Sequence, residues 1–188
     1  MLADAQREYV ARVTATLQII VAALAFGVLT FAGIALLVAV DAAGAAGGPA
    51  QPLLTYIAAG AALVALVLSW IVPGLIAGSG RQAIAASEPI SPATPMRDQP
   101  AANELGDVAP LLAAYQTRQI VRAAILEGAA FFCLISYIIE KQSLSLVAAG
   151  IMVLLLLGQF PTRSRVEDWI GGEMAAIEQL RQMRPVDA

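Results

Sequence analysis

One carboxylate lies inside a long apolar segment of this chain, and it is the side chain there most able to do chemistry. Glu127 stands about eight residues into the segment 120–139, on the order of 12 Å from its start at the helical rise per residue. A carboxyl at such depth is costly, so it indicates function and is expected to face a bundle interior or a wet cavity. Two roles stay open: a structural carboxyl that bonds across the bundle, or a group that handles protons or a transported ion.

If Glu127 has a partner, the partner has to come from another helix. Arg122 lies five residues earlier, and at 100° per residue the two side chains point about 140° apart. We expect Arg122 to extend toward the headgroups beside Arg118, one turn earlier. The polar candidates on other segments are Gln18, Tyr56, Ser69 and Gln159.

The rest of the chain lacks the residues of common active sites. It has no histidine, and its single cysteine, Cys133, is expected to be a small buried hydrophobe. There is no Gly-rich phosphate loop, no Ser/His/Asp set and no metal-ligand spacing. The net charge of −3 gives no reason to expect nucleic acid. We predict a protein without enzymatic activity, cofactor or metal, whose partners are the lipid bilayer and either further copies of itself or other membrane proteins.

Four apolar stretches position these residues: 16–40, 53–78, 120–139 and 143–160. Each is long enough to cross a bilayer core of about 30 Å, the last two with little to spare. The mean hydropathy is +0.76, and the runs are continuous rather than alternating, which excludes a barrel. The sequence therefore predicts an all-α polytopic membrane protein with four transmembrane helices.

The first stretch could instead be a cleaved signal peptide. Its apolar run exceeds the roughly 7–15 residues of a signal core, and Asp4 and Glu8 dilute the basic residues before it. Small residues just after the run are compatible with a cleavage site. We predict an uncleaved first helix.

The positive charges predict the orientation. Lys141 is the one basic residue of eleven that falls in the turns at 41–52 and near Glu140. Short cytoplasmic loops carry an excess of Lys and Arg. Both termini are therefore expected on the cytoplasmic side of the membrane.

The two halves of the chain resemble each other. Residues 18–27 (QIIVAALAFG) align with 119–128 (QIVRAAILEG), and 54–60 (LTYIAAG) with 144–150 (LSLVAAG). Chance similarity of Ala-rich helices is the alternative. A duplication predicts two tandem hairpins of the same orientation, a parallel repeat about an axis along the membrane normal.

Small residues at four-residue spacing are the predicted packing positions. Such pairs let helix backbones approach closely in lipid, although common membrane-helix composition would produce them too. We expect these faces to meet at the centre of a four-helix bundle. The predicted helix-packing residues are Ala23, Gly27, Ala124, Gly128, Gly60 and Gly150.

Four parts follow from this pattern: residues 1–78 with the first hairpin, a cytoplasmic Pro/Ala-rich linker at 79–108, the second hairpin at 109–160, and a cytoplasmic tail at 161–188. Pro73 and Gly74 should kink or end the second helix. Helix is expected to run from Pro110 into the third span, and the opening segment should extend the first span in the same way. The linker contains four prolines within 86–101; a recognition segment there is the alternative.

The tail is predicted to form an amphipathic helix, either on the inner leaflet or packed on the bundle or a partner. Trp169 lies on its flank, and together with Arg118 and Arg122 it is a predicted interface anchor. The pair Gly171 and Gly172 should weaken or bend the helix. Its apolar residues recur at three- and four-residue spacing: Val166, Ile170, Met174, Ile177, Leu180 and Met183.

Two resemblances follow from these residues. The segments Leu17–Phe31 and Tyr115–Phe132, with the ending Gln159–Arg163, resemble an uncharacterised family of bacterial four-helix integral membrane proteins, most specifically in Leu126–Phe132. That resemblance covers both hairpins and implies the fold alone. A duplicated hairpin with one carboxylate is also similar in outline to the proteolipid subunits of rotary ATPases, whose essential acid lies on the second helix of a hairpin, whereas Glu127 lies on the first.

The function predicted from this pattern is that of a non-enzymatic accessory or scaffold subunit of a membrane complex. The alternative is a small transporter or proton-handling oligomer, similar to a proteolipid ring, that uses Glu127. A membrane enzyme acting on lipid has only scattered carboxylates in its favour.

Overall fold

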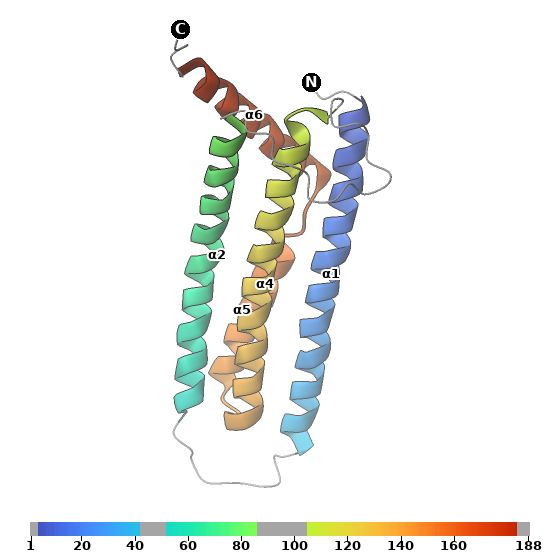
Figure 1. The fold of residues 1–188 in the computed structure, drawn as a ribbon. Coiled ribbons are helices and arrows are strands. Elements are labelled where there is room, and N and C mark those ends of the chain that lie inside the picture. The colour runs from blue at the N-terminus through green and yellow to red at the C-terminus, as the bar shows by residue number, and fades with distance from the viewer. Residues whose placement is uncertain (1–3, 42–51, 86–104, 184–188) are drawn as a thin grey trace. The chain divides into compact units, whose positions relative to one another are not determined.

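The described part of the protein is entirely helical. The computed structural model describes residues 4–41, 52–85 and 105–183. In these ranges no strand occurs, so the all-α prediction is confirmed there. Figure 1 shows the helices, which in chain order are α1 (Asp4–Asp41), α2 (Leu53–Ala85), α4 (Val108–Glu140), α5 (Ser143–Gly158) and α6 (Arg163–Met183).

Three of the helices are much longer than a bilayer is thick. The 38 residues of α1 extend about 57 Å, and the 33 residues of α2 and of α4 about 50 Å each, against a hydrocarbon core of about 30 Å. As predicted, α1 and α4 begin well before their apolar stretches and continue into them without a break. Polar flanks made of good helix formers allow this, because a helix already nucleated in the apolar stretch extends at little cost.

The second helix does not end at its proline. The sequence predicted a kink or an end at Pro73, but α2 continues to Ala85 and so includes residues 79–85 of the predicted linker. Pro73 is buried, and packing against neighbouring helices makes a proline tolerable inside a helix that contacts a membrane. The remainder of the proline-rich segment, 86–104, lies outside the described residues.

The fourth apolar stretch is shorter than predicted. The helices α1, α2 and α4 are each long and apolar enough to cross a membrane. α5 has 16 residues, about 24 Å, because its helix ends at Gly158. It passes the same test only in combination with α6, from which it is bent by 72°. The described residues therefore contain three candidate spans, or four if this bent pair counts as one.

The contacts within the chain divide it into two compact units. Unit 2, the membrane bundle, comprises residues 19–72 and 120–160, and in it α1, α2, α4 and α5 lie side by side (Figure 1). Its core is made largely of alanines, which let the helices approach closely where lipid gives no hydrophobic drive. Phe31 and Phe131 contact edge to face there, 5.2 Å between ring centroids. The alanines of this core are Ala25, Ala35, Ala58, Ala62, Ala65, Ala123, Ala129, Ala130 and Ala149.

The predicted small-residue faces do not form the centre of this bundle. Gly27 is half-buried, and the other five predicted packing residues, Ala23, Ala124, Gly128, Gly60 and Gly150, are exposed. The prediction was wrong because these helices are apolar on every side, so periodicity carries almost no signal for which stripe faces inward. Whether the exposed stripes pack against another protein stays a prediction.

Unit 1, the second compact unit, is made of residues 1–18, 73–119 and 161–188, as far as they are described. The tail helix α6 is present and continuous through Gly171 and Gly172. Trp169 packs against Tyr115 of α4 at 5.1 Å between ring centroids, so this helix contacts its own chain. Of the predicted apolar face, Val166, Ile170 and Ile177 are buried, whereas Met174, Leu180 and Met183 are exposed.

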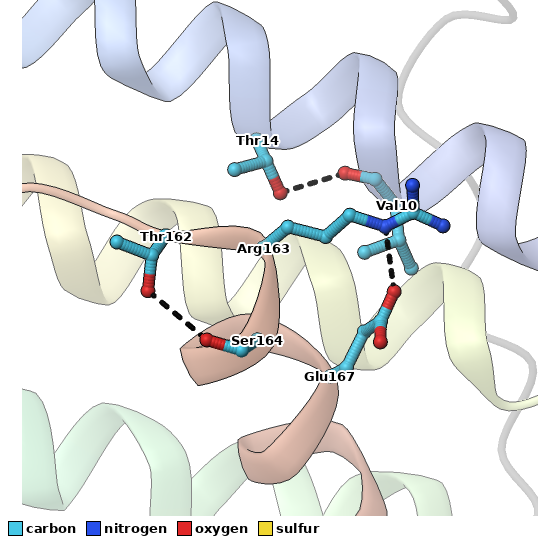
Figure 2. A network of polar contacts seen from close by, with 6 residues as sticks. All are labelled: Val10, Thr14, Thr162, Arg163, Ser164 and Glu167. Atoms are coloured by element: carbon cyan, nitrogen blue, oxygen red, sulfur yellow. Dashed lines mark hydrogen bonds and ion pairs between the residues drawn. The ribbon is translucent and has the colours of Figure 1, made fainter.

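The start of α6 is stabilised by local polar contacts (Figure 2). Arg163 Nε donates to Glu167 Oε1 at 2.7 Å, a pair spaced by one helical turn. Thr162 and Ser164 lie 3.5 Å apart, and on α1 the hydroxyl of Thr14 donates to the Val10 carbonyl at 2.7 Å. These contacts join residues close together in the sequence, so they stabilise local structure rather than form a binding site.

Candidate intramembrane site

Glu127 lies on α4, close to Gly27 of α1. Its carboxyl is half-buried, and its Oε1 atom lies 4.0 Å from the point that a Cβ on Gly27 would occupy. A methyl group at position 27 would reach only ordinary van der Waals contact with this oxygen, so the carboxyl lies next to α1 without depending on the glycine. Among the described residues, Glu127 has neither a hydrogen bond nor an ion pair. The carboxyl is thus partly open to the surroundings of the bundle, without a hydrogen-bond partner in the part of the chain that the structure describes.

The partners predicted for Glu127 are engaged or directed elsewhere. The Gln18 amide donates to the carbonyl of Pro161 at 2.8 Å. The Ser69 hydroxyl donates to Leu66, one turn earlier on its own helix, at 2.7 Å. Tyr56 is exposed and Gln159 is buried. None of these four candidates forms a hydrogen bond with Glu127 in the described residues, and Gln18 and Ser69 donate to other groups.

A second carboxylate, which the sequence interpretation passed over, caps another helix of the same chain. Glu140 ends α4, and its two carboxylate oxygens accept the backbone N–H groups of Leu54 and Thr55, each at 2.7 Å. These amides lie in the first turn of α2, where backbone donors lack partners within the helix. The residue before α2 is Pro52, whose side chain cannot accept a hydrogen bond. A helix with no capping side chain of its own is the signal that could have revealed this contact.

Three buried hydroxyls continue from this cap into the bundle. Ser145 donates to Thr55 at 3.0 Å, and Thr55 in turn donates to Glu140. Ser136 and Ser145 lie 3.1 Å apart, and because the one hydroxyl hydrogen of Ser145 is already used, Ser136 must be the donor. The chain Ser136–Ser145–Thr55–Glu140 therefore joins α4, α5 and α2 in a single hydrogen-bond direction.

The electrostatics at Glu140 follow from this geometry. The apolar segment of α4 ends at Ile139, so Glu140 is the first residue beyond it. Partial burial raises the pKa of Glu140, but the hydrogen bonds from the Thr55 side chain and from the amides of Leu54 and Thr55 outweigh burial and leave the pKa below its ordinary value. The group therefore acts as a charged cap rather than as an acid.

The predicted interface anchors stack on aromatic rings. The Arg118 guanidinium lies 6.0 Å from the centroid of Trp169 within unit 1. In the membrane bundle the Arg122 guanidinium lies 5.1 Å from the centroid of Trp70, a residue that sequence reasoning did not single out. Both distances are within the range of cation–π attraction. An amphipathic aromatic ring inside the apolar stretch 53–78 was the available signal for Trp70.

The remaining candidate is Cys133, which is buried in the membrane bundle. Its Sγ atom lies 3.7 Å from the carbonyl oxygen of Ala58 on α2, to which the thiol donates a weak hydrogen bond. No group of three His, Cys, Asp or Glu side chains suited to a metal ion occurs in residues 4–41, 52–85 and 105–183. The thiol therefore acts as a small packing residue with one weak hydrogen bond.

No family model, curated protein or solved structure matches this chain. The resemblance to bacterial four-helix membrane proteins stays a prediction.

Proposed function

We propose that this chain is a non-enzymatic accessory or scaffold subunit of a membrane complex, and that a partner helix packs on the outer face of α1 and α4 around Glu127. The proposal includes the finer topology predicted from the sequence: four spans in two tandem hairpins, both termini in the cytoplasm, in a bacterial inner membrane. The described helices that are long and apolar enough for a bilayer support it.

The observation that carries the proposal is the carboxyl of Glu127. It is half-exposed, it has no polar partner among the described residues, and it lies beside Gly27. A polar group left without a hydrogen bond in hydrocarbon is costly, so a helix that supplies a donor or acceptor gains that free energy on binding. Ala124 and Gly128, on either side of Glu127 in the sequence of α4, are exposed and small enough to admit another backbone closely.

A proton-handling oligomer is the second candidate, and the same carboxyl favours it. A carboxyl on the outer face of a bundle can exchange a proton with a path formed at a subunit interface, as the outline similarity to proteolipid subunits implies. This candidate requires that the acid itself, and not only its hydrogen bonds, be necessary. Glutamine, which keeps the shape and hydrogen-bonding capacity of glutamate but not the titration, separates the two functions.

The experiment compares Glu127→Gln and Glu127→Leu with the unchanged chain, each expressed at natural abundance and extracted gently from its own membrane. Tyr56→Phe, which removes another exposed hydrogen-bonding group, is the control for changes at the bundle surface. Native mass spectrometry identifies what remains bound, and reconstituted vesicles with a pH-sensitive dye report proton flux.

The accessory function predicts a complex with other proteins that survives Glu127→Gln and Tyr56→Phe but is lost or weakened in Glu127→Leu, with no proton flux. A closed ring of identical chains whose flux is abolished by Glu127→Gln would establish the second candidate instead. A chain that is isolated alone, with no flux and no change in either Glu127 variant, would refute both.

A further inference from the structure

The stacked pair Arg122 and Trp70 lies beside an apolar strip on the outside of the membrane bundle. Trp70 is 69% exposed, although its ring lies 5.1 Å from the Arg122 guanidinium. On α2, three more exposed apolar residues, Leu63, Val67 and Ile71, share the face of Trp70 because they recur at helical spacing. The surface therefore combines a long apolar strip with a cation beside it.

The guanidinium is suited to a phosphate group. Stacking on an indole uses the flat face of a guanidinium, whereas its N–H donors lie in the plane and match two phosphate oxygens at once. The ring also restricts the orientation of the long Arg122 side chain, so less conformational entropy is lost when a ligand binds. Arg122 is the third residue of the apolar stretch 120–139, so its guanidinium starts close to one end of that stretch.

From this arrangement we propose that Arg122 and Trp70 bind the phosphate of an anionic phospholipid, whose acyl chain lies along the exposed strip of α2. An amphipathic ligand fits both parts of the surface, whereas a free phosphate would contact only the cation. This site is independent of Glu127 and of the function proposed above. If the site exists, anionic phospholipid is enriched over other lipids at this one position of the protein surface.

The test reads the lipid next to one tryptophan in the full-length chain. The chain has two tryptophans, so Trp169→Phe leaves Trp70 as the single fluorophore. The protein is reconstituted into phosphatidylcholine vesicles that contain a minority of phosphatidylglycerol with brominated acyl chains. A second preparation carries the bromine on phosphatidylcholine at the same mole fraction. Quenching of Trp70 measures which lipid is enriched beside the ring.

We expect brominated phosphatidylglycerol to be enriched roughly fivefold over its mole fraction, the effect of one arginine near a membrane surface. Arg122→Gln should reduce the enrichment to the bulk value. Arg118→Gln is the matched control, because it removes a positive charge one turn earlier on the same helix, and its own stacking partner, Trp169, is already phenylalanine in this background. It should leave the enrichment at Trp70 unchanged. Far-UV circular dichroism verifies the fold of each variant.

Three results would overturn the proposal. The first is quenching that follows the mole fraction in the parent chain, and the second is an equal loss in Arg118→Gln, which would indicate a general surface charge. The third is loss of the enrichment when glycerol phosphate is added to the buffer, which would assign the site to a soluble phosphate. If Arg122→Gln fails to fold, Arg122→Lys carries the test. It keeps the charge without the planar stack, so an enrichment equal to the parent's would refute the role of the guanidinium.

Discussion

Replacing Ser145 by alanine should destabilise the membrane bundle by about 1–2 kcal/mol. Ser145 is fully buried and forms two hydrogen bonds, to Thr55 at 3.0 Å and with Ser136 at 3.1 Å. A hydrogen bond contributes a net 0.5–1.5 kcal/mol in folded proteins and about 0.6 kcal/mol between membrane helices. Two bonds therefore give roughly 1–3 kcal/mol. The lower half of that range applies, because the Ser136 hydroxyl can turn to a carbonyl one turn earlier on α4.

The assay is equilibrium unfolding in mixed micelles, followed by far-UV circular dichroism, with the free energy of unfolding compared between variants. Ser143→Ala is the matched control, because this serine lies on the same helix but is exposed. It should change the free energy of unfolding by no more than a few tenths of a kcal/mol. The double variant Ser145→Ala with Thr55→Val closes a double-mutant cycle. Its coupling energy should be about 0.6 kcal/mol, the mean for a pair between membrane helices.

Two results would refute this reasoning. One is a loss below about 0.3 kcal/mol for Ser145→Ala, which would mean that the unfolded chain in the micelle satisfies the hydroxyl equally well. The other is strict additivity in the double variant, since two groups that share a hydrogen bond must couple.

Three further predictions concern the same unit. Glu140 has a pKa below its ordinary value, so its stabilising effect is complete above the pKa of the unfolded state. The effect is lost as the pH falls through the pKa of the folded state, and the melting temperature should therefore fall on acidification. Glu140→Gln should lower the melting temperature at neutral pH and remove that part of the pH dependence. Ala130→Leu should destabilise by about 1–3 kcal/mol in the unfolding assay, because Ala130 is fully buried among helices, while Ala124→Leu on the exposed face should cost almost nothing; equal effects would contradict the observed inward face. Leu134→Ala should cost about 2–5 kcal/mol by leaving a cavity, and a change below 1 kcal/mol would show that this position is not packed.

The residues of the candidate site were predictable to different degrees. Glu127 was found from the sequence because a lone carboxyl in an apolar segment is conspicuous whatever surrounds it. Its surroundings were not, since the position beside Gly27 and the absence of a cross-bundle partner depend on how α1 and α4 are rotated. Glu140 was passed over because its partners, Leu54 and Thr55, lie far away along the chain.

The sequence by itself predicted the helices and their suitability for a bilayer. Long continuous apolar runs favour helices in a bilayer, because hydrocarbon offers no partner for a backbone N–H or C=O group. The helical extensions before the first and third spans also followed from the sequence, since nothing in those flanks breaks a helix. These conclusions needed only composition and the order of residues along one segment.

Only the tertiary structure decided which faces of those helices are inside. Helices that are apolar all round gain the same transfer free energy in any rotation, so close packing of alanines, and not hydrophobicity, determines the core of the membrane bundle. The same applies to the contacts between distant segments: the cap of α2 by Glu140 and the Arg122–Trp70 stack exist because packing brings two helices to one level. A sequence records each partner, but the distance between them is a property of the fold.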